Sequence, residues 1–385
     1  MTRPLRIGHV LTNLHDGGIE RVVFELCIGL DRDCFESRVY AMIRDNPWID
    51  RFREAGISVR TYNAINRISP RAFPRNAKVM LQLAADLRDD QIEIGQAHDF
   101  FPGVLGRCAM AFAGTPHRIA TLHNTYTWLG RPHGLLNRLL ALGSDRIVGV
   151  SQACVKDSRG RDRIPESKYR VIYNGVDERI YHPAPECRTA LRQELGWPEN
   201  AVILGNIGTV SERKRQADLV EAFACLAPRH PDLRLLLIGS RRSHEAEVAR
   251  DLEERLAHPE LQGRWAWLSD RHDVERLLAG CDIFCMPSRV EGFSVALVEA
   301  LMTGLPVILS DIPSFRETVN DGNDGTIFPL GDVNALAERL EQLLADPLLR
   351  ARLGAAGRHK ALENFSRSAM MAGWQKLYRE LEKNP

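Results

Sequence analysis

The sequence predicts an α/β fold built from two doubly wound parallel sheets. Short β-branched runs alternate with helical patterns along nearly all of the 385 residues, as in parallel sheets with helices on both faces. About fourteen strands are too many for one twisted sheet, so we expect two. At roughly 150 residues per domain the length also suggests two or three domains. The hydrophobic fraction of 44% excludes a disordered chain, a collagen or a small disulfide scaffold.

The first half begins with a strand and alternates regularly from there. Its expected strands are residues 6–11, 38–42, 58–62, 92–96, 118–122, 146–150 and 170–172. Its expected helices are residues 19–30, 78–88 and 135–142. These elements form a first domain over residues 1–180.

The second half repeats the alternation after an interruption. Turn formers and a polar helix at 188–195 break the pattern, so we expect a hinge or linker at 181–200. The second domain, 201–365, has expected strands at 202–207, 234–238, 265–267, 283–286, 307–310 and 325–328. Its expected helices are 216–226, 245–256, 274–278, 295–302 and 333–344. An amphipathic helix at 366–382 is expected to return to the first domain.

Charge is distributed unevenly although the formal net charge is only +1. Residues 1–180 contain 26 Lys and Arg against 20 Asp and Glu, or +6, and residues 181–385 contain 25 against 30, or −5. A basic first half suits an anionic substrate or membrane surface, and residues 66–78 mix four cations with Ile and Phe. A chance imbalance or a solvated loop stays an equal alternative. We expect no nucleic-acid partner.

The cysteines and the apolar segments indicate the compartment. Eight cysteines are scattered without a CxxC pair, which is typical of reduced, buried thiols in a cytoplasmic protein. The first residues lack the apolar stretch of a signal peptide, and the most apolar long segment, 293–310, carries Glu299. We therefore expect a cytoplasmic protein, with peripheral contact to the inner face of the membrane as an option.

Two loops that follow strands have the composition of anion sites. Gly17 and Gly18 lie between the first strand and first helix, where glycine lets a ligand approach the backbone and free N–H groups. Residues 208–215, after the first strand of the second domain, include the adjacent cations Arg213 and Lys214, which suit a pyrophosphate. A tight turn and a solvated basic turn are the alternatives.

A third loop, after the strand 283–286, gives the strongest signal. Backbone amides of Gly292, Phe293, Ser294 and Val295 are expected at a positive helix N-terminus, where they can bind a donor's phosphates. Glu299 lies in that otherwise apolar helix, and a buried carboxylate usually has a partner. The glutamates of this segment are expected to accept hydrogen bonds from hydroxyls rather than contact phosphate.

With these residues the chain resembles the retaining glycosyltransferases of family 4. The resemblance rests on several segments spread over almost the whole chain: Glu291 and Glu299 within 287–307, then 17–21, 121–124, 171–177, 271–274 and 282–288. It implies the GT-B fold, in which two Rossmann-like domains face each other across a cleft, and a C-terminal helix that returns to the N-terminal domain.

The resemblance also implies roles for individual residues. Gly17 and Gly18 match the glycine loop that faces the donor's phosphates and sugar, and His123 matches the histidine that reaches the donor sugar near the reaction centre. In the second domain, Lys214 matches the lysine that neutralises the pyrophosphate.

The acids of the third loop match as well, with one departure nearby. Glu291 matches the acid that holds sugar hydroxyls, and Glu299 the acid on the nucleotide's ribose. The family usually has arginine where this chain has Thr209, and Arg213 could supply that charge. The catalytic residues implied are thus His123 and Glu291.

The implied reaction moves a hexosyl or N-acetylhexosaminyl group from a nucleotide-sugar, most commonly a UDP-sugar, with retention. The acceptor would be a glycan or a lipid-linked glycan of cell-surface polysaccharide or glycolipid synthesis. No metal or other cofactor is expected. The Asp31–Asp33 pair, which follows the first helix rather than a strand, is interpreted as a solvated helix terminus.

Other classes fit less well. A nucleotide-sugar epimerase shares the two-domain fold, and a non-catalytic sugar-binding or scaffold protein would tolerate Thr209; both stay as alternatives. A dehydrogenase would need G-x-G-x-x-G after a strand, and a P-loop kinase would need a Gly-Lys pair, and the sequence contains neither.

Overall fold

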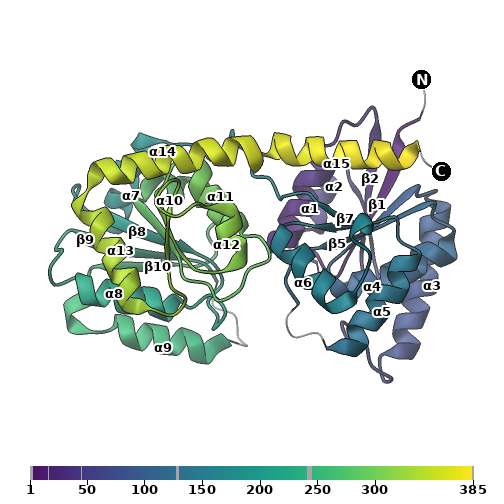
Figure 1. Ribbon diagram of the computed structural model, residues 1–385, viewed down its shortest axis with the longest axis horizontal. Helices are drawn as coiled ribbons and strands as arrows, with labels where there is room; N and C mark the ends of the chain where they lie inside the picture. The colour runs from purple at the N-terminus through teal and green to yellow at the C-terminus, as the bar shows by residue number, and fades with distance from the viewer. Residues whose placement is uncertain (1–2, 16, 45, 127–129, 241–244, 384–385) are drawn as a thin grey trace. The chain divides into compact units, whose positions relative to one another are not determined.

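A computed structural model describes residues 3–15, 17–44, 46–126, 130–240 and 245–383. It divides into two compact units (Figure 1): unit 1 comprises residues 1–175 with 367–385, and unit 2 comprises residues 176–366. Each unit contains one parallel sheet flanked by helices, as the alternating pattern predicts.

Unit 1 is a seven-stranded parallel sheet in the order β3-β2-β1-β4-β5-β6-β7. The strands are β1 Leu5–Leu11, β2 Phe35–Ala41, β3 Ser58–Thr61, β4 Ile94–His98, β5 His117–Leu122, β6 Arg146–Gly149 and β7 Tyr169–Val171. The helices are α1 Gly18–Gly29, α2 Ile49–Glu54, α3 Phe73–Asp89, α4 Phe100–Ala113, α5 Arg131–Leu142, α6 Gln152–Asp162 and α15 Arg367–Glu382.

Two apolar cores lie on opposite faces of this sheet, and alternate side chains of β1 belong to one or the other. Val10 packs with α3 and α4, for example against Leu83 and Met110. The next residue, Leu11, packs on the opposite face with α1 and α2, for example against Phe52. Successive side chains of a strand point to opposite faces, so one short apolar run contributes to both layers.

The C-terminal helix α15 belongs to unit 1. Its apolar side is buried, and the hydroxyl of Tyr378 hydrogen-bonds to Gln96 in the middle of the sheet. Gly29 of α1 faces Met371, where an added Cβ would lie 2.7 Å from the sulfur. The absence of a side chain at Gly29 therefore lets α1 and α15 pack closely.

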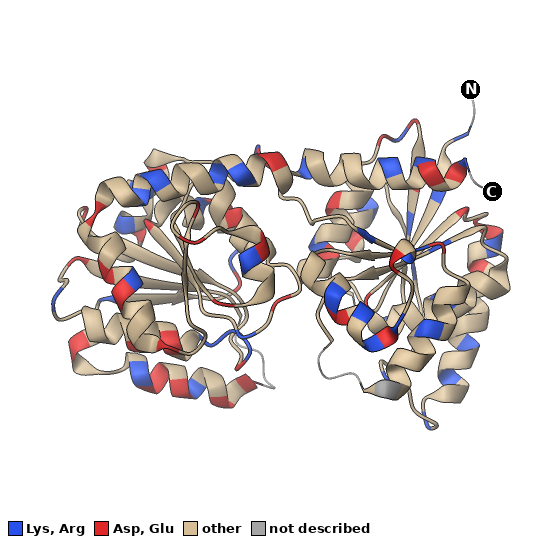
Figure 2. Cartoon of the chain, in the orientation of Figure 1, with Lys and Arg blue, Asp and Glu red and all other residues tan. Residues whose placement is uncertain are grey.

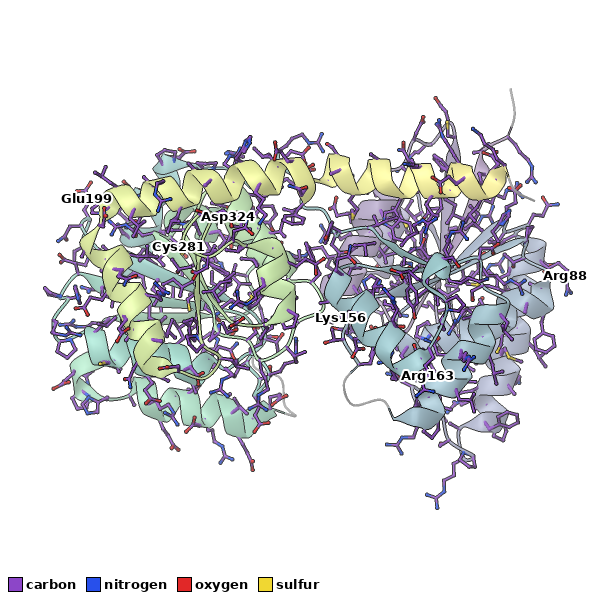
Figure 3. The ribbon with its side chains drawn as sticks, viewed as in Figure 1. Arg88, Lys156, Arg163, Glu199, Cys281 and Asp324 are labelled. Atoms are coloured by element: carbon purple, nitrogen blue, oxygen red, sulfur yellow. The ribbon has the colours of Figure 1, made fainter. Side chains whose placement is uncertain are left out.

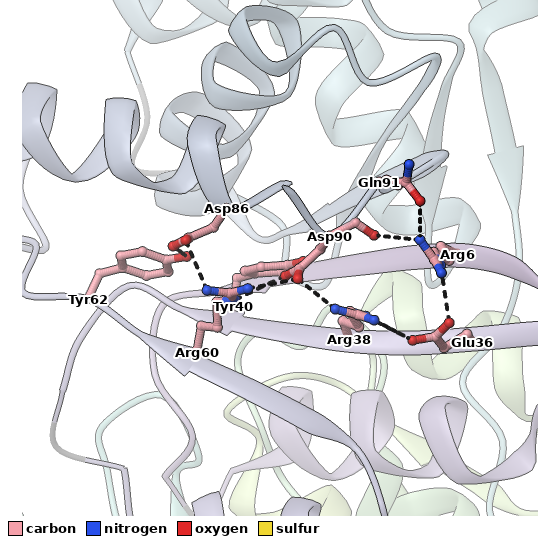
Figure 4. Close-up of polar contacts among 9 residues, drawn as sticks. All are labelled: Arg6, Glu36, Arg38, Tyr40, Arg60, Tyr62, Asp86, Asp90 and Gln91. Carbon is pink, nitrogen blue, oxygen red and sulfur yellow. Dashed lines mark hydrogen bonds and ion pairs between the residues drawn. The ribbon is translucent and has the colours of Figure 1, made fainter. Parts of the chain in front are cut away.

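Charged residues connect the outer strands of unit 1 to the end of α3 (Figure 4). Asp90 accepts hydrogen bonds from Arg38 (2.6 Å), Arg60 (2.7 Å) and the Tyr40 hydroxyl (2.7 Å), and its side chain is almost fully buried. Asp86 accepts from Arg60 and from the hydroxyl of Tyr62.

Unit 2 is a six-stranded parallel sheet in the order β10-β9-β8-β11-β12-β13. The strands are β8 Val202–Ile207, β9 Leu233–Ile238, β10 Trp265–Leu268, β11 Ile283–Met286, β12 Val307–Ser310 and β13 Thr326–Phe328. The helices are α7 Pro185–Leu195, α8 Gln216–Leu226, α9 Ala246–Leu256, α10 Val274–Gly280, α11 Val295–Met302, α12 Pro313–Thr318, α13 Val333–Ala345 and α14 Pro347–Asn364.

The segment expected as a linker, 181–200, lies within unit 2. Its helix α7 buries Leu191 and Arg192, and Arg192 pairs with the buried Asp282 at 2.7 Å. Asp282 also accepts from the backbone N–H of Ile203 in β8. A buried charge needs this partner, so α7 is tied to the sheet of unit 2.

Charged residues lie on the helices of both units (Figure 2), and the cysteines are only in part buried. Basic and acidic residues are interspersed along the helices of both units (Figure 2). Four of the eight cysteines are buried, including Cys281 beside the strands of unit 2 (Figure 3), where burial raises the pKa of the thiol well above the usual value. The expectation of buried thiols is wrong for Cys34, Cys108 and Cys187, which are partly exposed, and for Cys225, which is exposed. The described helices include none that is long and apolar enough to cross a membrane.

Candidate active site

The strand order places a loop pair at a ligand-binding position in each unit. In unit 2 the order reverses between β8 and β11, and in unit 1 between β1 and β4. Ligands of open parallel sheets bind beyond the carboxyl ends of the strands at such a switch point. The loops at these positions are 208–215 and 287–294 in unit 2, and those after Leu11 and His98 in unit 1.

Glu291 joins the two loops of unit 2. Its carboxylate pairs with the Nζ of Lys214 at 2.8 Å and with the guanidinium of Arg213 at 3.0 Å. The loops also bond through their backbones, because the N–H of Arg289 donates to the carbonyl of Arg213 at 2.8 Å. Two expected donor-binding cations and an expected catalytic acid thus form one cluster.

The surroundings of Glu291 keep its carboxylate charged. Burial by itself would raise the pKa, but the nearby charges of Lys214 and Arg213 outweigh it and hold the pKa of Glu291 below its usual value. Lys214 is 14% exposed and Arg213 is 47% exposed, so the lysine is the more shielded partner. The cluster is therefore an ionised group with an excess positive charge, in which Glu291 is buried, Lys214 is partly shielded and Arg213 is exposed.

Glycine at position 208 allows Lys214 to approach the backbone. Gly208 follows β8 with φ of +155°, and an added Cβ would lie 3.3 Å from the Cε of Lys214. A side chain here would be strained and would crowd the lysine. Thr209, the departure from the family pattern, accepts a hydrogen bond at its backbone oxygen from Gln216, the first residue of α8.

The N-terminus of α11 forms the other side of this loop pair. Ser294 caps the helix, with its hydroxyl accepting from the N–H of Leu297 at 3.2 Å, and Val295 is the first helical residue. The ring of Phe293 is buried, edge-on against the ring of Phe365. Gly292 is buried as well.

Glu299 lies one turn further along α11 and is 3% exposed. Its backbone carbonyl accepts from the hydroxyl of Thr303, which begins the turn that ends the helix. Both glutamates that sequence reasoning selected are therefore buried in the same unit, one in the loop and one in the helix.

In unit 1 the glycine loop begins α1. Gly17 is the N-cap, and an added Cβ would collide with the carboxylate of Glu20. Among the described residues, no atom lies within 4 Å of a Cβ added at Gly18, apart from its own neighbours in the helix and chain. The backbone at Gly18 is therefore open to a ligand.

His123 follows β5, as expected, and is buried at 6% exposure. Its Nε2 lies 3.0 Å from the Nδ1 of His98, whose Nε2 lies 3.2 Å from the Nδ1 of His9. Burial lowers the pKa of His123 and of His9 to about 3, and lowers that of His98 well below its usual value. All three imidazoles are neutral at physiological pH. Sequence reasoning missed His9 and His98.

Asp99 is a second feature that sequence reasoning missed. It follows His98 with φ of +75° and ψ of −179°, a conformation that is nearly restricted to glycine and costs about 1–3 kcal/mol. Burial raises the pKa of Asp99 to about 6, although a hydrogen bond from Asn124 opposes the shift. The hydroxyl of Tyr126 also donates to its carboxylate. Backbone strain and a shifted pKa beside His123 are typical of functional positions.

The Asp31–Asp33 pair lies where a solvated helix terminus was expected. Both residues are exposed in the turn after α1, and the N–H of Asp33 donates to the carboxylate of Asp31 at 3.1 Å. In the described part of the chain no group of three or more His, Cys, Asp or Glu is arranged to hold a metal ion.

Two family models match the chain in succession. The model described as Glycosyltransferase Family 4 matches residues 16–179, and the model described as Glycosyl transferases group 1 matches residues 188–360. The chain belongs to the family 4 glycosyltransferases. As a glycosyltransferase it is an enzyme, and the matched segments contain every site residue that the sequence analysis selected; of the residues that it missed, His98 and Asp99 lie within them and His9 lies outside.

Several proteins are similar in sequence to part or most of this glycosyltransferase. It is 29% identical to the N-acetyl-alpha-D-glucosaminyl L-malate synthase of Bacillus anthracis over 264 residues, which are 68% of this chain and 67% of that enzyme. It is 28% identical to a GDP-mannose-dependent phosphatidylinositol monomannoside mannosyltransferase of Corynebacterium glutamicum, covering 74% and 75%. With the putative glycosyltransferase EpsF of Bacillus subtilis it shares 26% identity, covering 92% and 89%.

Solved structures give the glycosyltransferase its fold class. Anabaena HepE, crystallised with UDP and glucose, superposes with a TM-score of 0.86 at 21% identity, covering 98% of this chain and all of HepE. Sucrose-phosphate synthase of Thermosynechococcus elongatus superposes with a TM-score of 0.83 at 20% identity, covering 99% and 100%. The expected GT-B fold is confirmed.

Proposed function

We propose that this glycosyltransferase moves a sugar from a nucleoside diphosphate sugar, with UDP as the carrier, to a glycan or lipid-linked acceptor. The observation that carries the proposal is the cluster of Glu291 with Lys214 and Arg213 at the switch point of unit 2. Relatives that act on phosphatidylinositol mannoside and diphosphoundecaprenol acceptors support a role in cell-surface polysaccharide or glycolipid biosynthesis.

The cluster has the charges that a leaving diphosphate needs. Lys214 and Arg213 can turn from Glu291 to the diphosphate, and the amides of residues 292–295 add donors at the helix N-terminus. Glu291 is then free to accept hydrogen bonds from sugar hydroxyls, and Glu299 from the ribose. These groups stabilise the leaving group in place of a metal ion, so we propose a metal-independent enzyme.

In unit 1, Gly18 leaves room for the donor's phosphates, and His123 contributes a neutral imidazole near the sugar. A neutral imidazole can hydrogen-bond a sugar hydroxyl and steady charge that develops at the anomeric carbon. We propose transfer with retention, in which the donor's own phosphate oxygen accepts the proton of the attacking hydroxyl.

Loss of Glu299 tests the donor site. A hydrogen bond to a charged group contributes about 1.5–3 kcal/mol, so Glu299→Ala should weaken UDP binding by about 10- to 100-fold in calorimetric titration. Unchanged affinity in a folded variant would remove Glu299 from the site.

Transfer activity should also survive EDTA, because the cations and helix amides take the place of a metal ion. Complete loss of activity that manganese or magnesium restores would overturn metal independence.

A surface of unit 1 suits an anionic membrane. Ile68 and Phe73, before and at the start of α3, are 47% and 70% exposed, and Arg71 and Arg75 beside them have no ion pair in the described residues. Exposed apolar and unpaired cationic side chains together bind anionic lipid surfaces. We propose that this surface brings the enzyme to a lipid-linked acceptor.

Vesicle flotation tests this contact. The enzyme should float with phosphatidylglycerol vesicles and not with phosphatidylcholine vesicles, and Phe73→Ser should abolish flotation. Phe112→Ser is the matched control, because Phe112 is 61% exposed but lies at the other end of a neighbouring helix, α4. Equal loss in both variants, or flotation with neither lipid, would contradict the proposal.

A further inference from the structure

Three histidines form a continuous hydrogen-bonded line through unit 1. His9, His98 and His123 are 0%, 2% and 6% exposed. The rings of His9 and His98 have centroids 5.4 Å apart, and those of His98 and His123 are 5.2 Å apart. The line begins inside the sheet and ends at the residue expected to serve the reaction.

The strand order brings these residues together although 89 positions separate His9 from His98. β4 lies between β1 and β5, with His9 beside Gln96 and His98 beside Thr121 in the register. His98 therefore lies two residues nearer than His9 to the carboxyl ends of the strands, and His123 lies two residues nearer than His98.

Neutral imidazoles couple their tautomers along such a line. Each neutral ring carries one N–H donor and one acceptor nitrogen, so His98 can donate to only one neighbour and must accept from the other. Either every proton points from His9 toward His123, or every proton points from His123 toward His9. The first arrangement leaves the proton of His123 on Nδ1, and the second places it on Nε2.

The inner end of the line distinguishes the two arrangements. The Nε2 of His9 is fully buried and has no hydrogen-bond partner among the described residues. The second arrangement would put an N–H there, and an orphaned buried N–H is rarer than an unsatisfied acceptor. The first arrangement leaves only an unprotonated nitrogen at this position.

We propose that His98 is a positioning residue for His123: it accepts at Nε2 from the Nδ1–H of His9 and donates from Nδ1 to the Nε2 of His123. His123 is thereby held as the Nδ1–H tautomer, with that N–H as its hydrogen-bond donor. The bond to His98 uses the Nε2 of His123, and no described residue makes a hydrogen bond to its Nδ1. Under the proposed function, on which this step rests, the donated hydrogen bond goes to a hydroxyl of the donor sugar.

The tautomer can be measured directly, without substrate. In the full chain labelled with ¹⁵N-histidine, long-range ¹H–¹⁵N correlation spectra distinguish the protonated nitrogen of each ring, and a His123→Gln variant assigns the signals. We expect the proton of His123 on Nδ1 and that of His98 also on Nδ1. A proton on the Nε2 of His123 would overturn the proposal, whether or not transferase activity is found.

Two variants of His98 then separate positioning from packing. In His98→Asn the side-chain amide overlaps the Nδ1 position of the imidazole and can still donate to His123, whereas the longer side chain of His98→Gln reaches only the Nε2 position. We expect kcat to stay within about threefold in His98→Asn and to fall by about 10- to 100-fold in His98→Gln, with the KM for the donor unchanged in both.

The control for loss of a buried histidine is His117→Gln, at the start of β5 in the same sheet. It should leave the tautomer of His123 and kcat unchanged. If His98→Asn and His98→Gln lower kcat equally while the tautomer of His123 is retained, His98 acts through packing and the proposal fails. Absence of transfer in the wild type, with the expected tautomer present, would instead contradict the proposed function.

Discussion

At the scale of single residues, Glu291 shows how an acid and two cations can share one site. The carboxylate stays charged although it is buried, because Lys214 and Arg213 compensate for the lost water. Under the proposed function, the same cations also bind the diphosphate of the donor. Because Arg213 is more exposed than Lys214, we expect the two residues to contribute unequally to diphosphate binding.

Replacing each cation separately tests whether Lys214 contributes more to UDP binding than Arg213 does. Lys214→Met should weaken UDP binding by about 10- to 100-fold, because a shielded charge–phosphate contact contributes about 1.5–3 kcal/mol. Arg213→Met should weaken it by less than about fivefold, since an exposed charge is screened by water and salt. Calorimetric titration of both variants provides the comparison, and equal losses would contradict the assignment.

The raised pKa of Asp99 predicts that the stability of the folded protein depends on pH. Its pKa of about 6 in the folded protein exceeds the value of 3.8 for an unperturbed aspartate, so between pH 4 and 6 the folded state binds more protons than the unfolded state. Stability contributed by this group is therefore present below pH 4 and is lost as pH rises toward 6. In Asp99→Asn, thermal unfolding should show a gain over wild type that grows from pH 4 to pH 6. A difference that is constant with pH would show that Asp99 titrates normally.

At the scale of elements, Asp90 ties α3 to strands β2 and β3 (Figure 4). Burial raises its pKa, but Arg60, Tyr40 and Arg38 outweigh burial and lower it. Asp90→Asn should reduce the free energy of unfolding by about 1.5–3 kcal/mol at pH 7. The loss should shrink as pH falls below the ordinary aspartate pKa, because the wild type then also loses its charge. Urea unfolding at pH 7 and pH 3 measures this; an equal loss at both would contradict it.

The strands were the most predictable elements because they are short, buried and rich in β-branched residues. The bounds of β8, β11, β12, α8 and α11 agree with the sequence prediction. Helix α4 was missed because Gly103, Gly106 and a continuous apolar run hide its period. Helix α14 has no clear apolar stripe, although Asp346 as N-cap followed by Pro347 was a usable start signal.

The positions of the candidate site residues were predictable where the residues lie in one segment, and less so where the fold brings distant segments together. Glu291 and Glu299 are eight positions apart, and a loop followed by a helix already suggests their location. The pairing of His9 with His98 and the strain at Asp99 depend on the strand order and on a backbone angle, which no local pattern encodes.

At the scale of the whole molecule, each unit has its own sheet and core, and each carries part of the proposed chemistry. Unit 2 holds the ionised cluster and the helix N-terminus, while unit 1 holds the open glycine loop and the histidine line. The family assignment spans both parts. Donor binding should therefore depend chiefly on unit 2, and turnover on both.

The most direct test is an NMR time course of the purified enzyme with a panel of UDP-, GDP- and ADP-sugars. Each donor is supplied with water or a short-chain lipid diphosphate glycan as acceptor, in EDTA. The account predicts release of UDP, with the first product carrying the same anomeric configuration as the donor. Product of inverted configuration, or stable donors across the whole panel with both acceptors, would contradict it.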